Sequence, residues 1–435
     1  MRFSELAGRR VVVWGHGREG RSVADHLRTI GVPALVAEPD LPAGDEDVQY
    51  GTSGAIQYGA AGREALLTAD VVVKSPGVPV TSDLYREVLA AGVGMTSLTD
   101  LWVNDNAARA VAVTGSKGKS TTSALIDHVL RSHGVRSSLR GNIGTSLLAE
   151  TEPPAEVVVM EVSSYQAQSL TVSPRVCVVT SLFPEHLTWH GSEEAYFADK
   201  LNLVAHGPEV VVVPGDSPDV RRRVAEAVSP GATTVETGPG TVRVDDAGDV
   251  VWADGTRVAS ADLPLRGGHQ AANIALAALA CAQLGVPPAA AAEAIASFSP
   301  LPHRMEPVPS GDGRTWIDDS LATAPEAVVA SLASLERGPV ALIVGGSDRG
   351  LDFAPLVTAL AQRDDVHLLL VGPTGRRLHE ATGTGRLFDS FADAVAWARS
   401  DANPCPTVLL SPGAPSHDEF ASYEQRAAAF RAGAI

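Results

Sequence analysis

Three segments of the chain share one pattern, a short run of β-branched residues, a glycine-rich turn and an alanine- and leucine-rich stretch with helical spacing. They lie at 10–30, 110–133 and 339–362. Further β-branched runs predict strands at 69–74, 156–161, 175–180, 209–213, 366–371 and 407–410. Because such strands alternate with helical stretches, the pattern predicts an α/β protein with parallel sheets built from βαβ units.

The distances between the three glycine turns indicate three α/β domains in series rather than a solenoid, since the repeat has no fixed period. We expect an N-terminal Rossmann-like domain over 1–107, a central domain with a parallel sheet over 108–300 and a C-terminal Rossmann-like domain over 301–435. The polar stretch 104–109 and the proline-rich stretch 299–309 are the candidate boundaries. Alternating short strands over 231–262 predict a β-hairpin excursion within the central domain.

Composition narrows the function classes. The chain of 435 residues has 34 basic and 51 acidic side chains, a formal charge of −17, which argues against a broad nucleic-acid-binding surface. Its three cysteines are far apart and form no CxxC motif, so we expect structural thiols rather than a disulfide or a zinc site. Neither a signal-peptide core nor an apolar run of ~18 residues is present, so we expect a cytoplasmic protein without membrane contact.

The second glycine turn has the features of a phosphate-binding loop. A strand ending at Thr114 leads into Gly115-Ser116-Lys117-Gly118-Lys119-Ser120-Thr121, which opens a helix. Glycines let backbone N–H groups curl around phosphates, and the helix adds its positive N-terminus. Lys119 is predicted to reach the β- and γ-phosphates, and Ser120 to bind Mg²⁺. The alternative is a plain turn between a strand and a helix.

The loop is shorter than that of most kinases and GTPases. Two residues separate Gly115 from Gly118, whereas the usual motif has four between its glycines. Downstream, the apolar run 157–160 ends at Glu161, where an acid following a phosphate loop can hold Mg²⁺ directly or through water. A single acid at a strand end is otherwise most often a solvated residue.

The first glycine turn points in another direction when taken alone. Gly15-His16-Gly17-Arg18-Glu19-Gly20 is a GxGxxG motif after a strand, and Glu38 ends the next predicted strand, where a ribose-binding acid is expected. This favours a nicotinamide-dependent oxidoreductase. A loop that holds the diphosphate of a UDP-linked molecule uses the same backbone features, however, and the phosphate loop with the later motifs favours a ligase.

Taken together, the motifs resemble those of the Mur ligase family and, over the whole chain, its MurD type. In order along the chain these motifs are the phosphate loop, Gly141-Asn142-Ile143-Gly144, Glu161 to Gln166, His186, Lys200, His269 with Asn273, Leu301-Pro302-His303-Arg304, Asp318-Asp319-Ser320, and Ser411-Pro412 through Ser416 and Phe420. The resemblance implies an ATP-dependent ligase that joins glutamate to UDP-N-acetylmuramoyl-L-alanine through an acyl phosphate. ATP and two Mg²⁺ ions are the implied cofactors, and a monomer is expected.

The resemblance also assigns roles to residues. It implies ATP and phosphate contacts for Gly115, Ser116, Lys117, Gly118, Lys119, Ser120, Thr121, Asn273, Arg304 and Asp319, with His269 near the nucleotide. It implies metal ligation by Ser120, Glu161, His186 and Lys200, the last as a lysine carbamylated by CO₂. Lys119, Lys200, His186 and Arg304 form the implied catalytic set. Residues alone would make Lys200 a solvated helix lysine.

The substrate contacts follow in the same way. The UDP-muramoyl substrate is expected at Arg18, Glu19, Ser75, Gly77 and Asn142, and glutamate at Thr323, Arg349, Ser416 and Tyr423. The N-terminal, central and C-terminal domains would then bind the UDP substrate, hydrolyse ATP and bind glutamate. No Ser-His-Asp or Cys-His arrangement suggests a covalent enzyme intermediate.

Departures from the family's motifs bear on the amino acid. The loop has Ser116-Lys117 where T-N is usual, Leu321 replaces a usual lysine, and Arg349 stands where the family has lysine. Arginine meets a carboxylate with a two-pronged fork, so the change is not neutral. The departures favour L-glutamate over D-glutamate. The alternatives are the D-glutamate reaction, a folylpolyglutamate-synthetase-like ligase, a P-loop kinase or transport ATPase, and a non-catalytic regulator that binds UDP-sugar or ATP.

Overall fold

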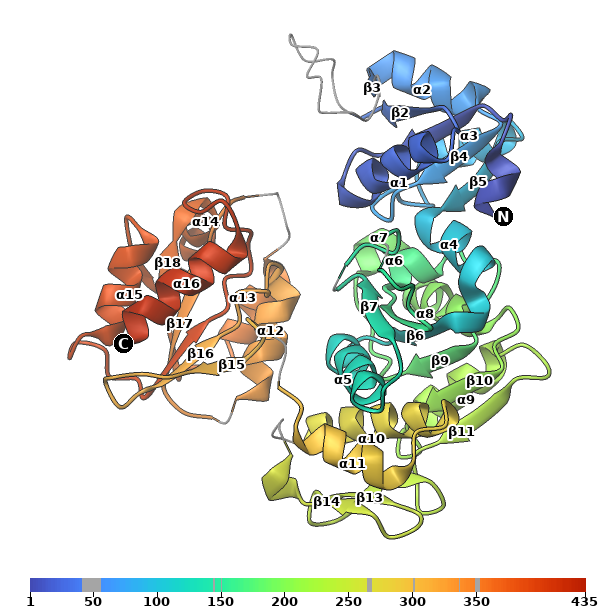
Figure 1. Cartoon of the computed structure of the whole chain (residues 1–435). Helices are drawn as coiled ribbons and strands as arrows, with labels where there is room; N and C mark the ends of the chain where they lie inside the picture. Colours follow the sequence, from blue (N-terminus) through green and yellow to red (C-terminus); the bar gives the residue numbers. More distant parts are fainter. Residues whose placement is uncertain are drawn as a thin grey trace. The chain divides into compact units, whose positions relative to one another are not determined.

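The computed structural model describes residues 1–40, 56–143, 145–149, 151–263, 268–299, 302–335, 337–348 and 353–435, apart from the side chains of Arg18, Thr188, His269, Glu326, Ala330 and Ser334. These residues form two compact units, Met1–Phe298 and Ser299–Ile435. The first unit holds two parallel sheets and a small antiparallel sheet, and the second holds one mixed sheet (Figure 1).

The first sheet is parallel, with the strand order β3-β2-β1-β4-β5. Its strands are β1 (Val11–Trp14), β2 (Ala34–Glu38), β3 (Ile56–Tyr58), β4 (Val71–Lys74) and β5 (Gly94–Ser97), and its helices are α1 (Arg18–Thr29), α2 (Gly59–Thr68), α3 (Asp83–Ala90) and α4 (Leu98–Asn106). The order reverses between β1 and β4. In open α/β sheets, the crevice at the carboxyl ends of the strands beside such a reversal binds ligands.

The second sheet has the order β11-β10-β9-β6-β8-β7 and is also parallel. Its strands are β6 (Ala110–Thr114), β7 (Ser137–Gly141), β8 (Val157–Glu161), β9 (Val176–Val179), β10 (Val210–Val213) and β11 (Thr233–Glu236). Its helices are α5 (Lys119–Ser132), α6 (Ser164–Ala167), α7 (Leu187–His190), α8 (Glu193–Leu201), α9 (Pro218–Ala227), α10 (Gly268–Gln283) and α11 (Pro288–Ala296). Every residue of β6 is buried, as expected for a central strand covered on both faces.

The segment 231–262 differs from the predicted hairpin. Its first strand, β11, joins the edge of the parallel sheet, while β12 (Val242–Val244), β13 (Val250–Trp252) and β14 (Arg257–Val258) form a separate antiparallel sheet. The sequence pattern did not separate these strands because all are short and flanked by similar turn residues.

The second unit has a sheet with the order β15-β16-β20-β17-β18-β19, parallel except for β15 against β16. Its strands are β15 (Glu306–Val308), β16 (Thr315–Asp318), β17 (Val340–Gly345), β18 (Val366–Val371), β19 (Arg386–Leu387) and β20 (Thr407–Leu410). Its helices are α12 (Pro325–Ser334), α13 (Ala354–Leu360), α14 (Gly372–Thr382), α15 (Phe391–Arg399) and α16 (Tyr423–Ala434). Separate core clusters, one around Trp316 and Phe430 and one around Val328 and Leu342, pack against this sheet.

The expected boundary at residue 107 lies inside one compact unit. Helix α4 explains this, because its Leu101 and Trp102 belong to a core cluster that contains residues of both parallel sheets. The buried carboxylate of Asp100 also accepts hydrogen bonds from the backbone N–H and the hydroxyl of Thr171, at 2.8 and 2.6 Å. The first two sheets are therefore joined by apolar packing and by buried polar contacts.

The α/β class and the parallel sheets predicted from the sequence are confirmed. The three cysteines, Cys177, Cys281 and Cys405, are buried and free, as predicted. Burial raises the pKa of Cys177 and of Cys281. Among the described residues, no helix is both long and apolar enough to span a bilayer.

Candidate active site

The phosphate loop follows the carboxyl end of β6, and α5 begins at Lys119. Gly115 and Gly118 have φ values of +144° and +88°, a region that side-chain-bearing residues rarely adopt. A Cβ added to Gly115 would lie 2.0 Å from the Thr180 hydroxyl. The residues after β9 hold the loop, since Ser116 N–H donates to Ser181 O at 2.7 Å. The glycines thus allow a turn that is fixed from the neighbouring strand.

Two lysines converge on the loop from different helices. Lys119 Nζ donates to Gly115 O at 2.9 Å and to Ser116 O at 3.0 Å, and Lys200 Nζ donates to Gly115 O at 2.9 Å. Lys200 is only 2% exposed, so it is not the solvated helix lysine that the residues alone suggest. Burial and then the nearby Lys119 ammonium lower the pKa of Lys200 well below its ordinary value. The site therefore gathers two lysine side chains where phosphates would bind, and their proximity favours the neutral form of Lys200.

Glu161 ends β8, the strand next to β6, and is 2% exposed. One carboxylate oxygen accepts a hydrogen bond from the Asn142 side chain at 2.7 Å, and the other has no hydrogen-bond partner among the described residues. A buried carboxylate oxygen is costly to leave uncompensated, and it is a ligand type that Mg²⁺ prefers. This orphaned oxygen fits a bound cation beside the phosphate loop.

The other predicted metal ligands do not form a compact cluster of metal-ligating side chains among the described residues. Ser120 is buried in the first turn of α5. His186 precedes α7 with φ = +55°, and its ring lies 5.2 Å from that of Tyr165. The described residues include one group of three metal-ligating side chains close together, His303, Glu306 and Asp318 in the second unit, and it contains none of the predicted ligands.

That three-residue cluster already has a cation from the protein. Arg431 forms ion pairs with Glu306 and, at 2.9 Å, with Asp318. His303 Nδ1 lies 2.8 Å from the same Asp318 carboxylate. Hydrogen bonds from Ser320 and His303 hold the pKa of Asp318 below its usual range although burial opposes them. The cluster therefore fixes the start of β15 to β16 and α16.

Several residues at the phosphate loop were missed from the sequence. The Tyr196 hydroxyl is 2.8 Å from Ser116 Oγ, and the Tyr196 ring lies 4.9 Å from Lys200 Nζ. The buried His190 ring contacts Asp199 at 2.6 Å and Ser164 at 3.0 Å. Burial lowers the pKa of His190, and the Asp199 carboxylate opposes that shift. The four-residue spacing of Tyr196 and Lys200 on one helix was the available signal.

Asn273, assigned to the nucleotide by resemblance, lies directly on the phosphate loop. A Cβ added to Gly118 would stand 2.2 Å from Asn273 Oδ1, and the Asn273 amide donates to Gln270 at 3.2 Å. The loop also carries an outer ion pair, since Lys117 Nζ lies 2.5 Å from Glu185. Thr121 lies in the first turn of α5. The structure therefore brings the phosphate-loop residues, Lys200, Glu161, Asn142 and Asn273 to one region of the first unit.

The predicted UDP-substrate residues lie at the first glycine turn and in the loop after β4. Ser75 donates to Gly15 O at 3.3 Å, and Glu19 accepts a hydrogen bond from the Gln166 side chain at 2.7 Å. Space around Gly77 is open, since a Cβ there would meet nothing within 4 Å. The carboxylate of Glu38, considered as a ribose ligand, accepts a hydrogen bond from the His16 backbone N–H. The Arg18 side chain lies outside the description.

In the second unit, the predicted glutamate residues follow neighbouring parallel strands. Thr323 comes after β16, Ser416 after β20, and Tyr423 begins α16. Gly413 N–H donates to Ala322 O at 2.7 Å, which ties the first two loops together. Arg349 lies outside the described residues, and no described contact bears on it.

Asp319 and Arg304 also lie in this unit. The buried Asp319 carboxylate accepts hydrogen bonds from the hydroxyls of Ser331 and Ser411 at 2.5 and 2.8 Å and from Met305 N–H at 3.2 Å. Burial raises the pKa of Asp319. Arg304 is exposed. Asp319 is thus engaged with its own unit, and its ribose contact stays a prediction.

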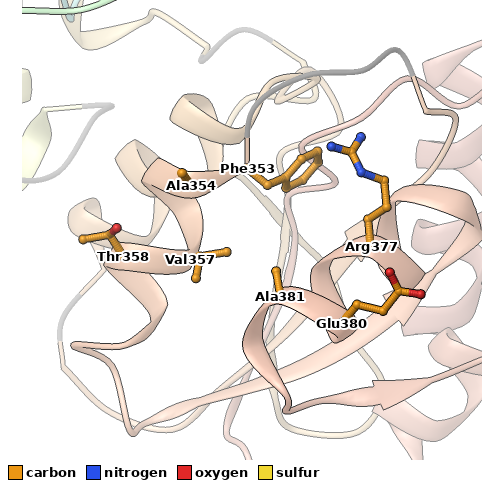
Figure 2. A pocket seen from close by; sticks show the side chains of 7 residues that line it. All are labelled: Phe353, Ala354, Val357, Thr358, Arg377, Glu380 and Ala381. Carbon is orange, nitrogen blue, oxygen red and sulfur yellow. The ribbon is translucent and has the colours of Figure 1, made fainter.

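A surface hollow in the second unit lies between α13 and α14 (Figure 2). It is lined by Phe353, Ala354, Val357, Thr358, Arg377, Glu380 and Ala381. The Arg377 guanidinium lies 5.6 Å from the Phe353 ring centroid and pairs with Asp348 at 2.6 Å. Of the predicted glutamate residues that the structure describes, Thr323, Ser416 and Tyr423, none lines this hollow.

The fold and the site together define a class of protein. A glycine loop that two lysines contact, a buried acid at the end of the next strand and an asparagine against the loop have the arrangement of a nucleoside-triphosphate site of the P-loop type.

Comparison with known proteins identifies the family. Residues 113–282 match the Mur ligase middle domain, and residues 303–413 match the glutamate ligase domain of Mur ligases. The chain belongs to the Mur ligase family, whose members are ATP-dependent amide-bond-forming ligases. The nicotinamide, kinase and transport-ATPase interpretations of the glycine turns are therefore wrong.

Individual relatives differ in the amino acid that they are named for. The chain is 41% identical to a UDP-N-acetylmuramoyl-L-alanine–L-glutamate ligase of a Micromonospora species, over 99% of this chain and 97% of the relative. It is 35% identical to a UDP-N-acetylmuramoylalanine–D-glutamate ligase of Symbiobacterium thermophilum, over 85% of this chain and 84% of the relative. A crystal structure of MurF from Acinetobacter baumannii shares the fold, with a TM-score of 0.57 and 18% identity over 97% and 90% of the two chains.

Proposed function

We propose that this protein joins L-glutamate to UDP-N-acetylmuramoyl-L-alanine with hydrolysis of ATP to ADP and phosphate, a step in peptidoglycan precursor synthesis. The observation that carries the proposal is the convergence of Lys119, Lys200 and the orphaned Glu161 oxygen on one phosphate loop. The near full-length similarity to a ligase named for this reaction supports the choice of substrates.

Amide formation needs an activated carboxylate, because a free carboxylate is a poor electrophile. In the proposed reaction, the alanine carboxylate attacks the γ-phosphorus of ATP, which forms an acyl phosphate and releases ADP. The glutamate amine then attacks the acyl carbon and phosphate leaves. Such phosphoryl transfer depends on positioning and on neutralising charge, so it calls for cations rather than a nucleophilic side chain.

Different residues of this chain are proposed to have different roles in the reaction. The Lys119 ammonium, fixed by two loop carbonyls, neutralises charge on the transferred phosphoryl group. Glu161, Ser120 and His186 are the proposed ligands of two Mg²⁺ ions, which would offset the phosphate charge. Asn273 of α10 lies against the loop at Gly118 and is proposed to position the nucleotide. Arg304 and Asp319 from the second unit are proposed to complete the ATP contacts.

Lys200 is proposed to act as a carbamate. Only the neutral amine adds CO₂, and burial lowers the pKa of Lys200 so that this form is more populated than in an exposed lysine. The carbamate would turn a cation into an oxygen ligand for the second Mg²⁺. Carbon-13 NMR after incubation with labelled bicarbonate should give one carbamate signal that is absent from Lys200→Ala. No signal in the native protein would contradict this assignment.

The amino acid is proposed to be bound by Thr323, Arg349, Ser416 and Tyr423 and to be L-glutamate. The 41% identical relative is named for L-glutamate, whereas the D-glutamate ligase is 35% identical over a shorter alignment. The D-glutamate reaction is the second candidate. A folylpolyglutamate-synthetase-like activity is less favoured, because the first unit carries an N-terminal parallel sheet with its own ligand crevice.

Phosphate release from ATP tests the proposal. The protein is incubated with UDP-N-acetylmuramoyl-L-alanine and either L- or D-glutamate, and the product is identified by mass spectrometry. We expect release with L-glutamate. Release only with D-glutamate would replace the proposed isomer, and no release with either would overturn the proposed reaction. Lys119→Ala serves as the inactive control.

A further inference from the structure

Lysine is rare in this chain. The sequence has thirty arginines but four lysines, Lys74, Lys117, Lys119 and Lys200. Three of these meet at the phosphate loop, where Lys119 and Lys200 bind loop carbonyls and Lys117 pairs with Glu185. Lysine differs from arginine in offering a compact point charge on a flexible stem, without the planar fork. Lys74 is the one lysine with no part in that site.

Lys74 stands at the edge of the first sheet where the strand order predicts a ligand crevice. It is the last residue of β4 and lies in register with Trp14, the last residue of β1. The strand order reverses between these two strands, so the crevice at their carboxyl ends is the expected binding place. Helix α1, of twelve residues, begins at Arg18 on the same edge and directs its positive N-terminus there.

The Lys74 ammonium is buried without a hydrogen bond from the part of the chain that the structure describes. The residue is 3% exposed. Burial lowers the pKa of Lys74 to about 8, although the carboxylates of Glu19 and Asp199 act in the opposite direction. Buried charges in proteins are normally paired at hydrogen-bond distance, and among the described residues neither carboxylate comes that close to this ammonium.

Hydrogen bonds hold the loops after β1 and β4 in place beside Lys74. Ser75 N–H donates to Trp14 O at 2.9 Å, and its hydroxyl donates to Gly15 O, so the two loops at the crevice are held together. Glu19, one of the two acids whose charge acts on Lys74, accepts a hydrogen bond from Gln166 at 2.7 Å. One oxygen of the Glu19 carboxylate is thus engaged by Gln166 of α6.

We propose that the Lys74 ammonium binds the diphosphate of the UDP-linked substrate, opposite the N-terminus of α1. This inference rests on the proposed function, since it presumes that the first sheet receives a UDP derivative. Lys74 supplies the charge and α1 supplies backbone N–H groups, whereas the uridine would depend on neither. The anionic part of the substrate is therefore recognised separately from its base.

Binding of UDP and of uridine, measured by calorimetry, tests the proposal. Lys74→Met removes the charge and keeps a side chain of similar length. Its affinity for UDP should fall by about 10- to 100-fold, as for loss of a charge-assisted contact, with its affinity for uridine unchanged. Arg10→Met is the matched control, because Arg10 is an exposed cation that pairs with Asp70 next to the amino ends of β1 and β4. It should bind UDP as the native protein does.

Thermal unfolding separates binding from a structural role. Without ligand, Lys74→Met should unfold within a few degrees of the native protein, but UDP should no longer raise its Tm. If Lys74→Met does not fold, Lys74→Gln takes its place in both measurements. In steady-state assays, KM for the UDP substrate should rise while KM for ATP stays the same.

The outcomes that oppose the proposal are distinct. Equal UDP affinity in the native protein and the Lys74 variant would overturn the inference and leave the proposed function standing. Equal losses for UDP and uridine would show that Lys74 shapes the crevice rather than holding phosphate. A native protein that binds no UDP would overturn the proposed function, and the inference with it.

Discussion

The glycine turn at 15–20 and the phosphate loop at 115–119 share a backbone design but differ in the charges around them. In each, a buried parallel strand ends, a glycine with positive φ turns the chain, and a helix begins. The phosphate loop is surrounded by Lys117, Lys119, Lys200, Glu161 and Glu185. The first turn has Glu19 and Glu38 beside it and Lys74 across the crevice.

The difference shows that the loop backbone determines that an anion can bind, and the neighbouring strands and helices determine which one. Helix N-termini and glycine backbones suit any phosphate. The concentrated cations and the orphaned acid at the second loop suit a triphosphate with a metal, where charge develops during the reaction. A single lysine at the first turn suits a diphosphate that is held and not broken.

The largest expected difference between the two loops is in their response to the loss of Lys119. Lys119→Ala removes the ammonium that two loop carbonyls hold, so ATP-dependent phosphate release should fall by about 10³-fold. UDP binding at the first crevice should be unchanged. Activity that survives in a correctly folded variant, by circular dichroism, would show that the phosphate loop is not the ATP site.

Glu161→Gln tests whether the orphaned oxygen binds metal. The variant keeps the side-chain shape but loses the negative charge on a buried group, so we expect activity to fall by about 10²-fold and the Mg²⁺ concentration at half-maximal activity to rise. The matched control is Glu209→Gln, which alters an exposed ion pair with Arg175. Equal Mg²⁺ dependence in native protein and Glu161→Gln would contradict a metal role.

The glycines just before the two helices should respond differently to alanine. Gly118 has φ = +88° and a Cβ there would approach Asn273 to 2.2 Å, so Gly118→Ala should cost about 1–3 kcal/mol of stability and raise KM for ATP about tenfold. Gly17 has φ = −67° and open space around it, so Gly17→Ala should change stability by less than about 0.5 kcal/mol. Urea unfolding measures the stability of each variant, and titration with ATP in the activity assay measures its KM. A similar loss of stability in Gly118→Ala and Gly17→Ala would contradict the proposal that only the second turn requires its glycine.

The pH dependence of stability should reveal the unpaired lysine at the first turn. Folding lowers the pKa of Lys74 from its ordinary 10.5 to about 8, so between these values the unfolded chain binds more protons than the folded one. The contribution of Lys74 to the free energy of unfolding therefore rises as the pH increases from about 8 to 10.5, and this gain is lost again as the pH falls back to about 8. Between pH 7.5 and 10, the native protein should gain on the order of 2 kcal/mol relative to Lys74→Met. Parallel pH profiles for the two proteins in urea unfolding would show that Lys74 is not buried as a charge.

Local patterns in the sequence predicted much of the fold and part of the site. The strand candidates at 156–161 and 366–371 correspond to β8 and β18, because β-branched runs bounded by turns have a local signature. The phosphate loop was recognised because its glycines and lysines are adjacent in the chain. The three short strands at 242–258 were not resolved, since pairing between short strands depends on partners and not on pattern.

The contacts that join distant segments could not be predicted. Residue order gives no sign that Lys200 reaches the Gly115 carbonyl, 85 residues earlier, or that Asp100 ties the first two sheets together through Thr171. His190 and Asp199 likewise acquire their pairing only when α7 and α8 pack together.

The sequence by itself determined the α/β class, the phosphate loop and the acid at the end of β8, because each depends on neighbours within a few residues. The tertiary structure alone decided which side chains are buried and which lack a partner. Burial lowers the pKa of both Lys74 and Lys200. Lys200 binds a loop carbonyl, whereas Lys74 has no hydrogen-bond partner among the described residues. That distinction arises from packing between segments far apart in the chain, since desolvation and pairing are properties of the folded surroundings.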